Sequence, residues 1–205
     1  MEQWYQQCSD PQRVEYVLSV HESRLEEFMD NERGRLGHPA WGRFKVVTNH
    51  GPDTNVSQVN FAASHTTGKL IIGTMDDLFA PRHWDDLVIA AVPDIEGEYI
   101  VQFSTGSVRD AEPLINAGVL TRKRYERYGY IGHPSYESMY VDDDMSAVAV
   151  KDRVLVQRLD IEFLHKHPCF GKGEWDDIYA LENRQQAMQQ GYQNFTQRKA
   201  AGFPQ

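Results

Sequence analysis

The chain has 205 residues and a net charge of −9, and 40% of its residues are hydrophobic. This length and composition allow one sizeable core, and the acidic balance argues against a broad basic face that grips nucleic acid. No apolar run approaches the roughly 20 residues that a membrane span needs, the N-terminus lacks the features of a signal peptide, and the few cysteines exclude a disulfide framework. We therefore expect one domain over residues 1–205 in a reducing, cytoplasmic setting.

Short apolar runs alternate with helical patterns along the chain. The expected strands are residues 15–20, 44–49, 70–72, 99–103 and 154–156. The expected helices are residues 23–33, residues 56–63 and a helix that opens at 81–84. This alternation predicts an α/β fold with a mixed, mostly parallel sheet flanked by helices. A polar, Gln-rich pattern from Asp176 to about Ala200, interrupted at Gly191, predicts a helical tail that either lies on the surface or binds a partner.

Two adjacent carboxylates, Asp76 and Asp77, follow the apolar strand at 70–72. Carboxylates are hard oxygen ligands, and a Mg²⁺ or Mn²⁺ ion bound by one or two of them shares its other positions with substrate phosphates. Ligands of open α/β sheets bind at the C-terminal edge of the strands. The pair therefore indicates a metal-assisted phosphate site, with an ordinary turn as the alternative because Asp favours turns.

Residues 122–128 interleave basic side chains with tyrosines. Such a segment either binds phosphate groups or forms the solvated face of a short helix. We favour the solvated face.

The order of polar residues and strands extends the argument beyond these single motifs. From the N-terminus it runs Ser19 and Arg24 beyond the first strand, Thr48-Asn49 at the end of the second, Asn60 in a helix, Thr67-Gly68-Lys69, an apolar strand and Asp76-Asp77. Downstream come Gly118–Arg122 and Tyr140–Ser146. From about Glu15 to Tyr179, this order resembles GT-A-fold glycosyltransferases, particularly the inverting family-2 type. Thr74 departs from the family's Asp-x-Asp-Asp motif, because it stands where the first Asp belongs.

The resemblance implies a GT-A-like, Rossmann-like fold with a nucleotide-sugar half over about 15–115, an acceptor half over about 116–180 and a helical tail over about 174–205. It also implies a metal-dependent, inverting transfer of a sugar from a nucleotide-diphosphate sugar, with a UDP- or GDP-sugar expected, to an acceptor hydroxyl. The acceptor is expected to be a glycan or a hydroxymethylated base in phage-type DNA. The cofactor is expected to be Mn²⁺ or Mg²⁺.

The resemblance also assigns candidate roles to single residues. The candidates for nucleotide-sugar binding are Ser19, His21, Arg24, Asn49, Asp53, Asn60, Lys69 and Asp76. The candidates for metal binding are Asp76, Asp77 and His165, with His167 as a weaker one. Asp142 is the candidate catalytic base and Asp143 the alternative, because three consecutive acids leave the register open. Asp144 is expected to be a solvated charge. The candidates for acceptor binding are Arg122, His133 and Tyr136.

Two other functions stay open at this point. A nucleotidyltransferase shares the scaffold and the acidic metal site, but it normally shows a Gly-rich, basic phosphate loop after the first strand, where this chain has Ser19–Arg24. A non-catalytic module that binds nucleotide sugars is favoured by Thr74 in place of an acid.

Overall fold

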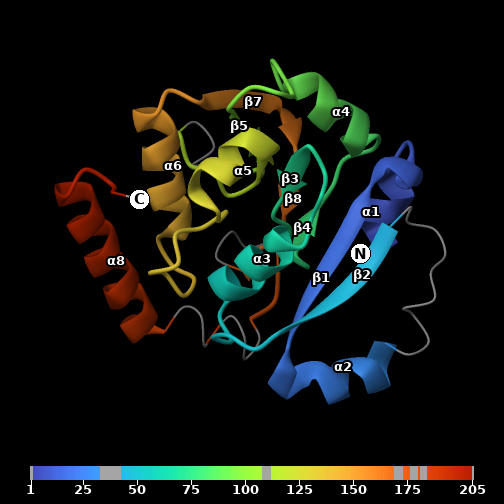
Figure 1. Ribbon diagram of the computed structural model, residues 1–205, viewed down its shortest axis with the longest axis horizontal. Helices are drawn as coiled ribbons and strands as arrows, with labels where there is room; N and C mark the ends of the chain where they lie inside the picture. Colours follow the sequence, from blue (N-terminus) through green and yellow to red (C-terminus); the bar gives the residue numbers. More distant parts are fainter. Residues whose placement is uncertain are drawn as a thin grey trace.

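The computed structural model describes residues 2–32, 43–107, 112–168, 173–175, 180 and 184–204. Its elements, where η marks a 3₁₀ helix, are α1 (Glu2–Gln7), η1 (Pro11–Arg13), β1 (Glu15–His21), η2 (Glu22–Arg24), α2 (Leu25–Glu32), β2 (Arg43–Asn49), α3 (Asn55–Ser64), β3 (Leu70–Ile72), β4 (Leu78–Phe79), α4 (Trp84–Ala91), β5 (Ile100–Ser104), β6 (Gly118–Thr121), α5 (Arg122–Tyr128), α6 (Val141–Lys151), β7 (Leu155–Glu162), β8 (Leu164–His165) and α8 (Gln185–Ala200) (Figure 1).

The described strands form three sheets. β1 and β2 pair in parallel, four strands lie in the order β3-β6-β5-β7, and β4 pairs with β8. In the four-stranded sheet β6 runs antiparallel to both neighbours, whereas β5 and β7 are parallel. The expected mixed α/β class with a C-terminal helix is confirmed. Antiparallel pairings are more frequent than the strand–helix alternation predicts, because β6 returns between β3 and β5 and two-residue strands pair at β4 and β8.

Local signals explain where several helices begin and end. The Thr54 hydroxyl accepts a hydrogen bond from Ser57 N at the start of α3, and the Thr121 hydroxyl does the same for Arg124 N at the start of α5. These side chains satisfy backbone N–H groups that have no partner within the helix. Gly129 ends α5 with a φ of +76°, a conformation that glycine adopts without steric cost.

An aromatic cluster joins the N-terminal helix to the centre of the molecule. The rings of Trp4 and Trp84 meet edge to face at 5.1 Å, and Phe163 packs against both Trp4 and Phe103. The indole N–H groups are satisfied as well: Trp4 donates to Leu78 O and Trp84 donates to Trp4 O, each at 2.8 Å. Large aromatic side chains bury much apolar area when their polar atoms have partners, so this cluster fixes α1 and α4 against the central strands.

The predicted C-terminal helical tail is confirmed over α8, which runs without interruption through Gly191. A Cβ atom at position 191 would lie 2.4 Å from the carbonyl oxygen of Met139, which shows that the glycine serves close packing. α8 lies beside α6, on the side of the molecule away from β1 and β2 (Figure 1). Among the helices of the described residues, none has the length and apolar character to cross a bilayer.

Candidate functional site

The first group of candidate residues gathers where β1 and β2 end. Because the two strands are parallel and in register, His21 and Asn49 are partners at the same edge. Asp53 lies at the centre of this group: Arg24 Nε donates to its carboxylate at 3.1 Å, Gln58 Nε2 donates at 3.3 Å, and His21 Nδ1 lies 4.0 Å away. The structure thus brings together residues that the sequence places at separate strand ends.

Gln58 is a member of this group that the sequence did not single out. Its Oε1 accepts a hydrogen bond from the Ser19 hydroxyl at 2.5 Å, so it connects β1 to Asp53. The feature of the sequence that could have pointed to Gln58 is its position one turn after the Thr54 cap of α3, on the helix that also carries Asn60. Asn49 is buried, accepts from Gly51 N and donates to Ser57 Oγ, which fixes the turn after β2.

A cavity of about 570 Å³ lies next to this group. It is lined by residues of β1 and β3 and by side chains of α3 and α4. Ser19, Gln58, Lys69 and Thr74 are among its lining residues. Ligand pockets of about 300–1,000 Å³ accept molecules the size of a nucleotide, so the volume suits such a ligand. Lys69 also forms an ion pair with Glu96, so its ammonium group already has a partner outside the cavity lining.

The candidate metal residues Asp77 and His165 are 88 positions apart in the sequence and adjacent in space. Leu78 in β4 is the partner of His165 in β8, and this pairing brings Asp77 Oδ2 to 2.9 Å from His165 Nε2. Lys166 N donates to Asp77 O at 2.8 Å and extends the pairing. The two side chains are only 13% and 10% exposed. A carboxylate and an imidazole therefore lie side by side in a largely water-excluded position.

This pair fits a divalent cation. Asp77 Oδ2 and His165 Nε2 are hydrogen-bonded at 2.9 Å, and two ligands at right angles on an ion with bonds of about 2.1 Å lie about 3 Å apart, so a cation could replace the shared proton without a large movement of either side chain. Carboxylate oxygen and imidazole nitrogen both suit Mn²⁺, and Mg²⁺ favours oxygen. No group of three or more His, Cys, Asp and Glu side chains poised for a metal occurs among the described residues. The donor set therefore matches an ion that takes its other ligands from phosphates and water.

Asp76 is exposed, unlike its neighbour Asp77. Its charge contributes to the environment of Tyr16 on β1, because burial and then the Asp76 carboxylate raise the pKa of that tyrosine. Tyr16 lines the cavity between β1 and β3. Asp76 is thus close enough to act electrostatically on a ligand in the cavity.

The candidate base lies in the first turn of α6. Burial, and then the like charge of Asp143, raise the pKa of Asp142 to about 6. Asp143 N donates to Asp142 Oδ1 at 3.0 Å. A carboxyl group with a pKa near the working pH is well suited to general-base catalysis, because it is ionised and still basic.

Asp144 departs from its expectation as a solvated charge. It is only 2% exposed, accepts a hydrogen bond from the Tyr136 hydroxyl at 3.0 Å, and is held by Arg198 of α8 through Nε at 2.7 Å. The expectation is wrong because its partner lies 54 residues away, beyond the reach of a local pattern. Buried carboxylates require such partners, since an unpaired charge is costly away from water.

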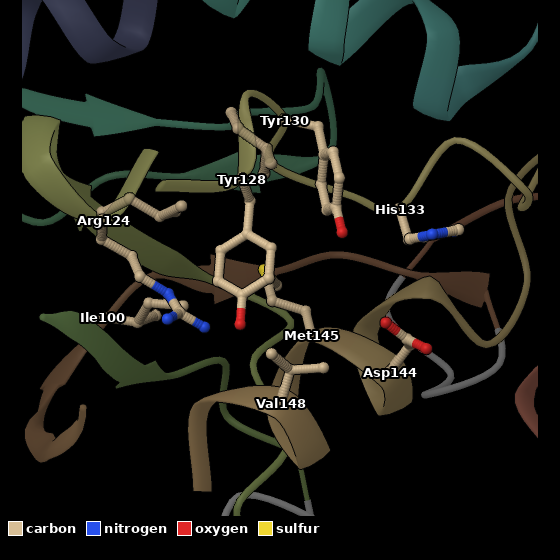
Figure 2. A pocket seen from close by; sticks show the side chains of 10 residues that line it. Ile100, Arg124, Tyr128, Tyr130, His133, Asp144, Met145 and Val148 are labelled. Atoms are coloured by element: carbon tan, nitrogen blue, oxygen red, sulfur yellow. The ribbon is translucent and has the colours of Figure 1, made fainter. Parts of the chain in front are cut away.

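Of the candidate acceptor residues, His133 and Tyr136 lie together, with ring centroids 6.3 Å apart, and Arg122 has its partners elsewhere. Arg122 donates twice to the Gly68 carbonyl, at 3.0 and 2.8 Å, so it holds the chain before β3. Tyr136 is buried against Asp144. His133 and Asp144 line a pocket of about 20 Å³ that has room for one or two waters (Figure 2). Burial and then the nearby Arg198 lower the pKa of His133.

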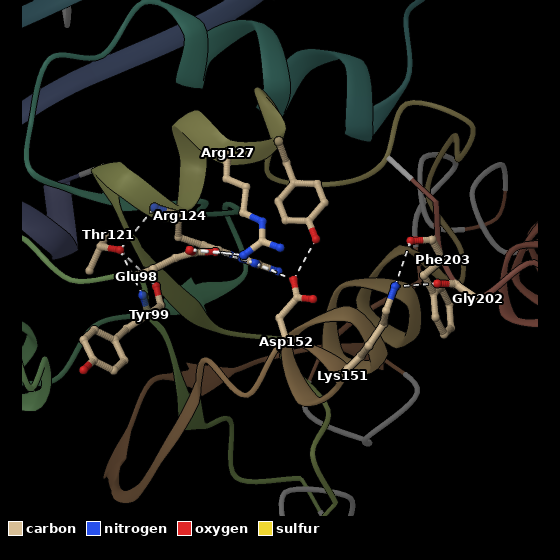
Figure 3. Close-up of polar contacts among 10 residues, drawn as sticks. Glu98, Tyr99, Thr121, Arg124, Arg127, Lys151, Asp152, Gly202 and Phe203 are labelled. Carbon is tan, nitrogen blue, oxygen red and sulfur yellow. Dashed lines mark hydrogen bonds and ion pairs between the residues drawn. The ribbon is translucent and has the colours of Figure 1, made fainter.

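Asn60 and the basic segment also have internal partners. Asn60 Oδ1 accepts from Ile131 N and Gly132 N, and its Nδ2 donates to Gly132 O at 2.7 Å. In the basic segment, Arg124 is 3% exposed and pairs with Glu98 and Asp152 (Figure 3). The expected solvated face is therefore wrong for Arg124, because two carboxylates draw it inward.

No protein-family profile matches the chain, and no curated protein matches its sequence. Among solved structures, the mannosyltransferase PcManGT from Pyrobaculum calidifontis, in complex with GDP-Man and Mn²⁺, is similar with a TM-score of 0.50 at 14% identity, over 94% of this chain and 77% of that chain. The catalytic domain of Drosophila β1,4-galactosyltransferase 7, in complex with xylobiose, has a TM-score of 0.47 at 10% identity, over 83% of this chain and 80% of that chain.

The likeness to the mannosyltransferase concerns the fold, because the sequence identity is low. The resemblance indicated by the order of motifs is thereby confirmed at the level of architecture: the chain shares its fold with this mannosyltransferase.

Proposed function

We propose that the chain is a metal-dependent, inverting glycosyltransferase that moves a sugar from a nucleotide-diphosphate sugar to an acceptor hydroxyl. The observation that carries the proposal is the Asp77–His165 pair, in which Asp77 follows by three residues the segment 66–74 that lines the large cavity. The fold adds support, since its solved neighbour binds GDP-Man and Mn²⁺. A UDP- or GDP-sugar is the donor class that we favour.

The donor would be held by the residues around the cavity. Ser19, His21 and Asp53 are proposed to contact the base and ribose, with Asn49 fixing the turn beneath them. Arg24 is half exposed and is proposed to turn from Asp53 toward the diphosphate. Asn60 and Lys69 are proposed to support donor binding indirectly. Asn60 holds the loop at Gly132, and Lys69 lines the cavity.

The metal ligands are proposed to be Asp77 and His165, with Asp76 beside them. A Mn²⁺ or Mg²⁺ ion bound there would offset the negative charge that develops on the leaving diphosphate. Asp77 and His165 contribute a preformed ligand pair, so little side-chain reorganisation is needed on binding. Asp76 keeps its carboxylate accessible for the donor or the ion.

The base is proposed to be Asp142, with Asp143 as the alternative. The carboxylate of Asp142 would accept the proton of the acceptor hydroxyl as its oxygen attacks the anomeric carbon, and the bond to the diphosphate breaks on the opposite face. One such displacement inverts the anomeric configuration.

The acceptor class that we favour is a glycan. The arginines at 122 and 124 already bind carbonyl and carboxylate groups within the chain, which weakens the case for a nucleic-acid acceptor at this strip. His133 lies in the loop before α6 and stays our candidate for acceptor contact.

A thermal-shift panel tests the proposal. Wild type and Asp77→Asn would be heated with UDP-, GDP-, CMP- and dTDP-sugars, with and without Mn²⁺. A ligand that binds only the folded state raises the midpoint of unfolding. We expect one nucleotide class to shift wild type only with metal, and the shift to be lost in the variant. No metal-dependent shift with any donor would contradict the proposal, whereas binding without turnover would favour a non-catalytic module.

A further inference from the structure

The C-terminal helix α8 is bound to α6 through a buried ion pair. Arg198 donates from Nε to Asp144 Oδ2 at 2.7 Å and from Nη2 to Asp144 Oδ1 at 3.3 Å, so both carboxylate oxygens are engaged. The Arg198 side chain is 11% exposed. Tyr136, in the loop before α6, donates to the same carboxylate. Such a bidentate ion pair restrains the relative orientation of the two side chains as well as the distance between them.

Other contacts of α8 reach the residues that lead directly into α6. Gly191 lies against the Met139 carbonyl, closer than any other residue type allows. The ring of Tyr140 meets the ring of Tyr192 at 5.8 Å and stacks on Phe195 at 6.2 Å. Tyr140 has a φ of +68°, which costs a non-glycine residue energy and persists only where surrounding contacts impose it. α8 supplies several of those contacts.

The remaining sides of α6 are held by other elements. Ser146 Oγ accepts from Ile115 N at 2.8 Å and donates to the Asp142 carbonyl, which ties the first turn to the segment before β6. At the far end, Lys151 Nζ donates to the carbonyl of Gly202, just beyond α8 (Figure 3). α8 and the residues just beyond it thus contact α6 from its first turn to its last.

The first turn of α6 carries three consecutive acids, of which Asp144 is the member that reaches Arg198. The bond between them fixes the turn in which Asp142 lies two residues earlier. We propose that Arg198 is a positioning residue for sugar transfer, which acts through Asp144 to hold the Asp142 carboxylate in place relative to the donor. This inference rests on the proposed function.

If Arg198 served stability alone, its replacement would have different effects from those expected for a positioning residue. Replacing a buried ion pair with well-packed hydrophobic residues of similar volume is often neutral or stabilising, so removal of both charges need not lower stability. A misplacement of about 1 Å in a reacting group, in contrast, lowers the rate about 100-fold. Arg198 does not line the large cavity, so its loss should leave donor binding unchanged.

The experiment measures release of nucleoside diphosphate from GDP-mannose, UDP-glucose, UDP-galactose and UDP-N-acetylglucosamine with Mn²⁺, using water as the acceptor. The variants are Arg198→Met, Arg198→Lys and the double variant Asp144→Asn/Arg198→Met. The control is Arg158→Met, because Arg158 is partly exposed and pairs with the exposed Asp160 of its own strand, β7. Thermal unfolding of every variant is recorded in parallel.

We expect Arg198→Met to lower kcat by about 10- to 100-fold with the donor KM unchanged. Arg198→Lys should recover part of kcat, because an ammonium group reaches one carboxylate oxygen. The double variant should regain the wild-type unfolding midpoint but not kcat, and the control should match wild type.

Three results would overturn the inference. A wild-type kcat in Arg198→Met would do so, as would recovery of both stability and kcat in the double variant, since the pair would then serve stability alone. An increase in donor KM that accounts for the whole loss would place Arg198 in donor binding. Wild type that turns over none of the four donors would overturn the proposed function as well, which separates the two failures.

Discussion

The decrease in activity at low pH is expected to report the carboxyl group of Asp142. Burial and the like charge of Asp143 raise the pKa of this group to about 6. A general base acts as its carboxylate, so kcat/KM should fall as the pH decreases through this value. With a pKa of about 6, the ionised fraction falls from about nine-tenths at pH 7 to about one-tenth at pH 5, a roughly tenfold decrease in kcat/KM.

Asp143→Asn provides the perturbation. It removes the neighbouring charge and keeps the backbone N–H that donates to Asp142. The pKa of Asp142 should then decrease, so the variant should retain more of its activity at pH 5 than wild type does. Asp142→Asn removes the base itself and should lower kcat by about 10²- to 10⁴-fold at every pH.

The assay is the initial rate of nucleoside diphosphate release at low donor concentration, measured as a function of pH for wild type and both variants. Because the two carboxyl groups interact, the wild-type profile reports the pair, and the variants separate its members. An active Asp143→Asn variant with an unchanged profile would refute the electrostatic reasoning. Loss of activity in Asp143→Asn, together with an active Asp142→Asn, would assign the base to Asp143.

Three further predictions concern the Asp77–His165 pair, the buried Arg124 and the close contact of Gly191. Asp77→Asn keeps the shape of the side chain but loses its charge, so calorimetric titration should show weaker Mn²⁺ binding, and equal affinity would contradict the ligand assignment. Arg124→Met should lower the free energy of unfolding in urea by about 3–5 kcal/mol, because it leaves the buried Asp152 carboxylate without its arginine. The more exposed Arg127→Met should cost clearly less, and equal losses would contradict this argument. Gly191→Ala should lower the thermal midpoint, since its Cβ would meet the Met139 carbonyl, and an unchanged midpoint would show that α8 moves without cost.

Part of the candidate site could be predicted because local patterns place polar residues at strand ends. His21 directly follows one predicted strand and Asn49 ends the next, and parallel pairing necessarily brings such ends to one edge. Asp77 and His165 each adjoin or occupy a short strand, and the β4–β8 pairing places them at 2.9 Å. The register of that pairing could not be predicted from the sequence, because two-residue strands carry almost no alternation of polar and apolar residues.

The rest depends on contacts that no local pattern contains. A run of three acids at a helix start is typical of a solvated turn, and nothing near Asp144 indicates Arg198. Arg124 shows the same limit, since its partners Glu98 and Asp152 lie 26 and 28 residues away on either side. Gly191 interrupts a helical pattern by composition, but tertiary packing overrides its low helix propensity.

The most direct test of the central claim is ¹H NMR of the sugar released from the donor that the thermal-shift panel identifies, recorded with Mg²⁺ during the first turnovers. The account predicts metal-dependent release of a sugar whose anomeric configuration is opposite to that of the donor, seen before the anomers equilibrate, and no release by Asp142→Asn. Release with retained configuration would contradict the single displacement by an Asp142-activated hydroxyl. No release from a donor that binds would contradict the enzymatic function itself.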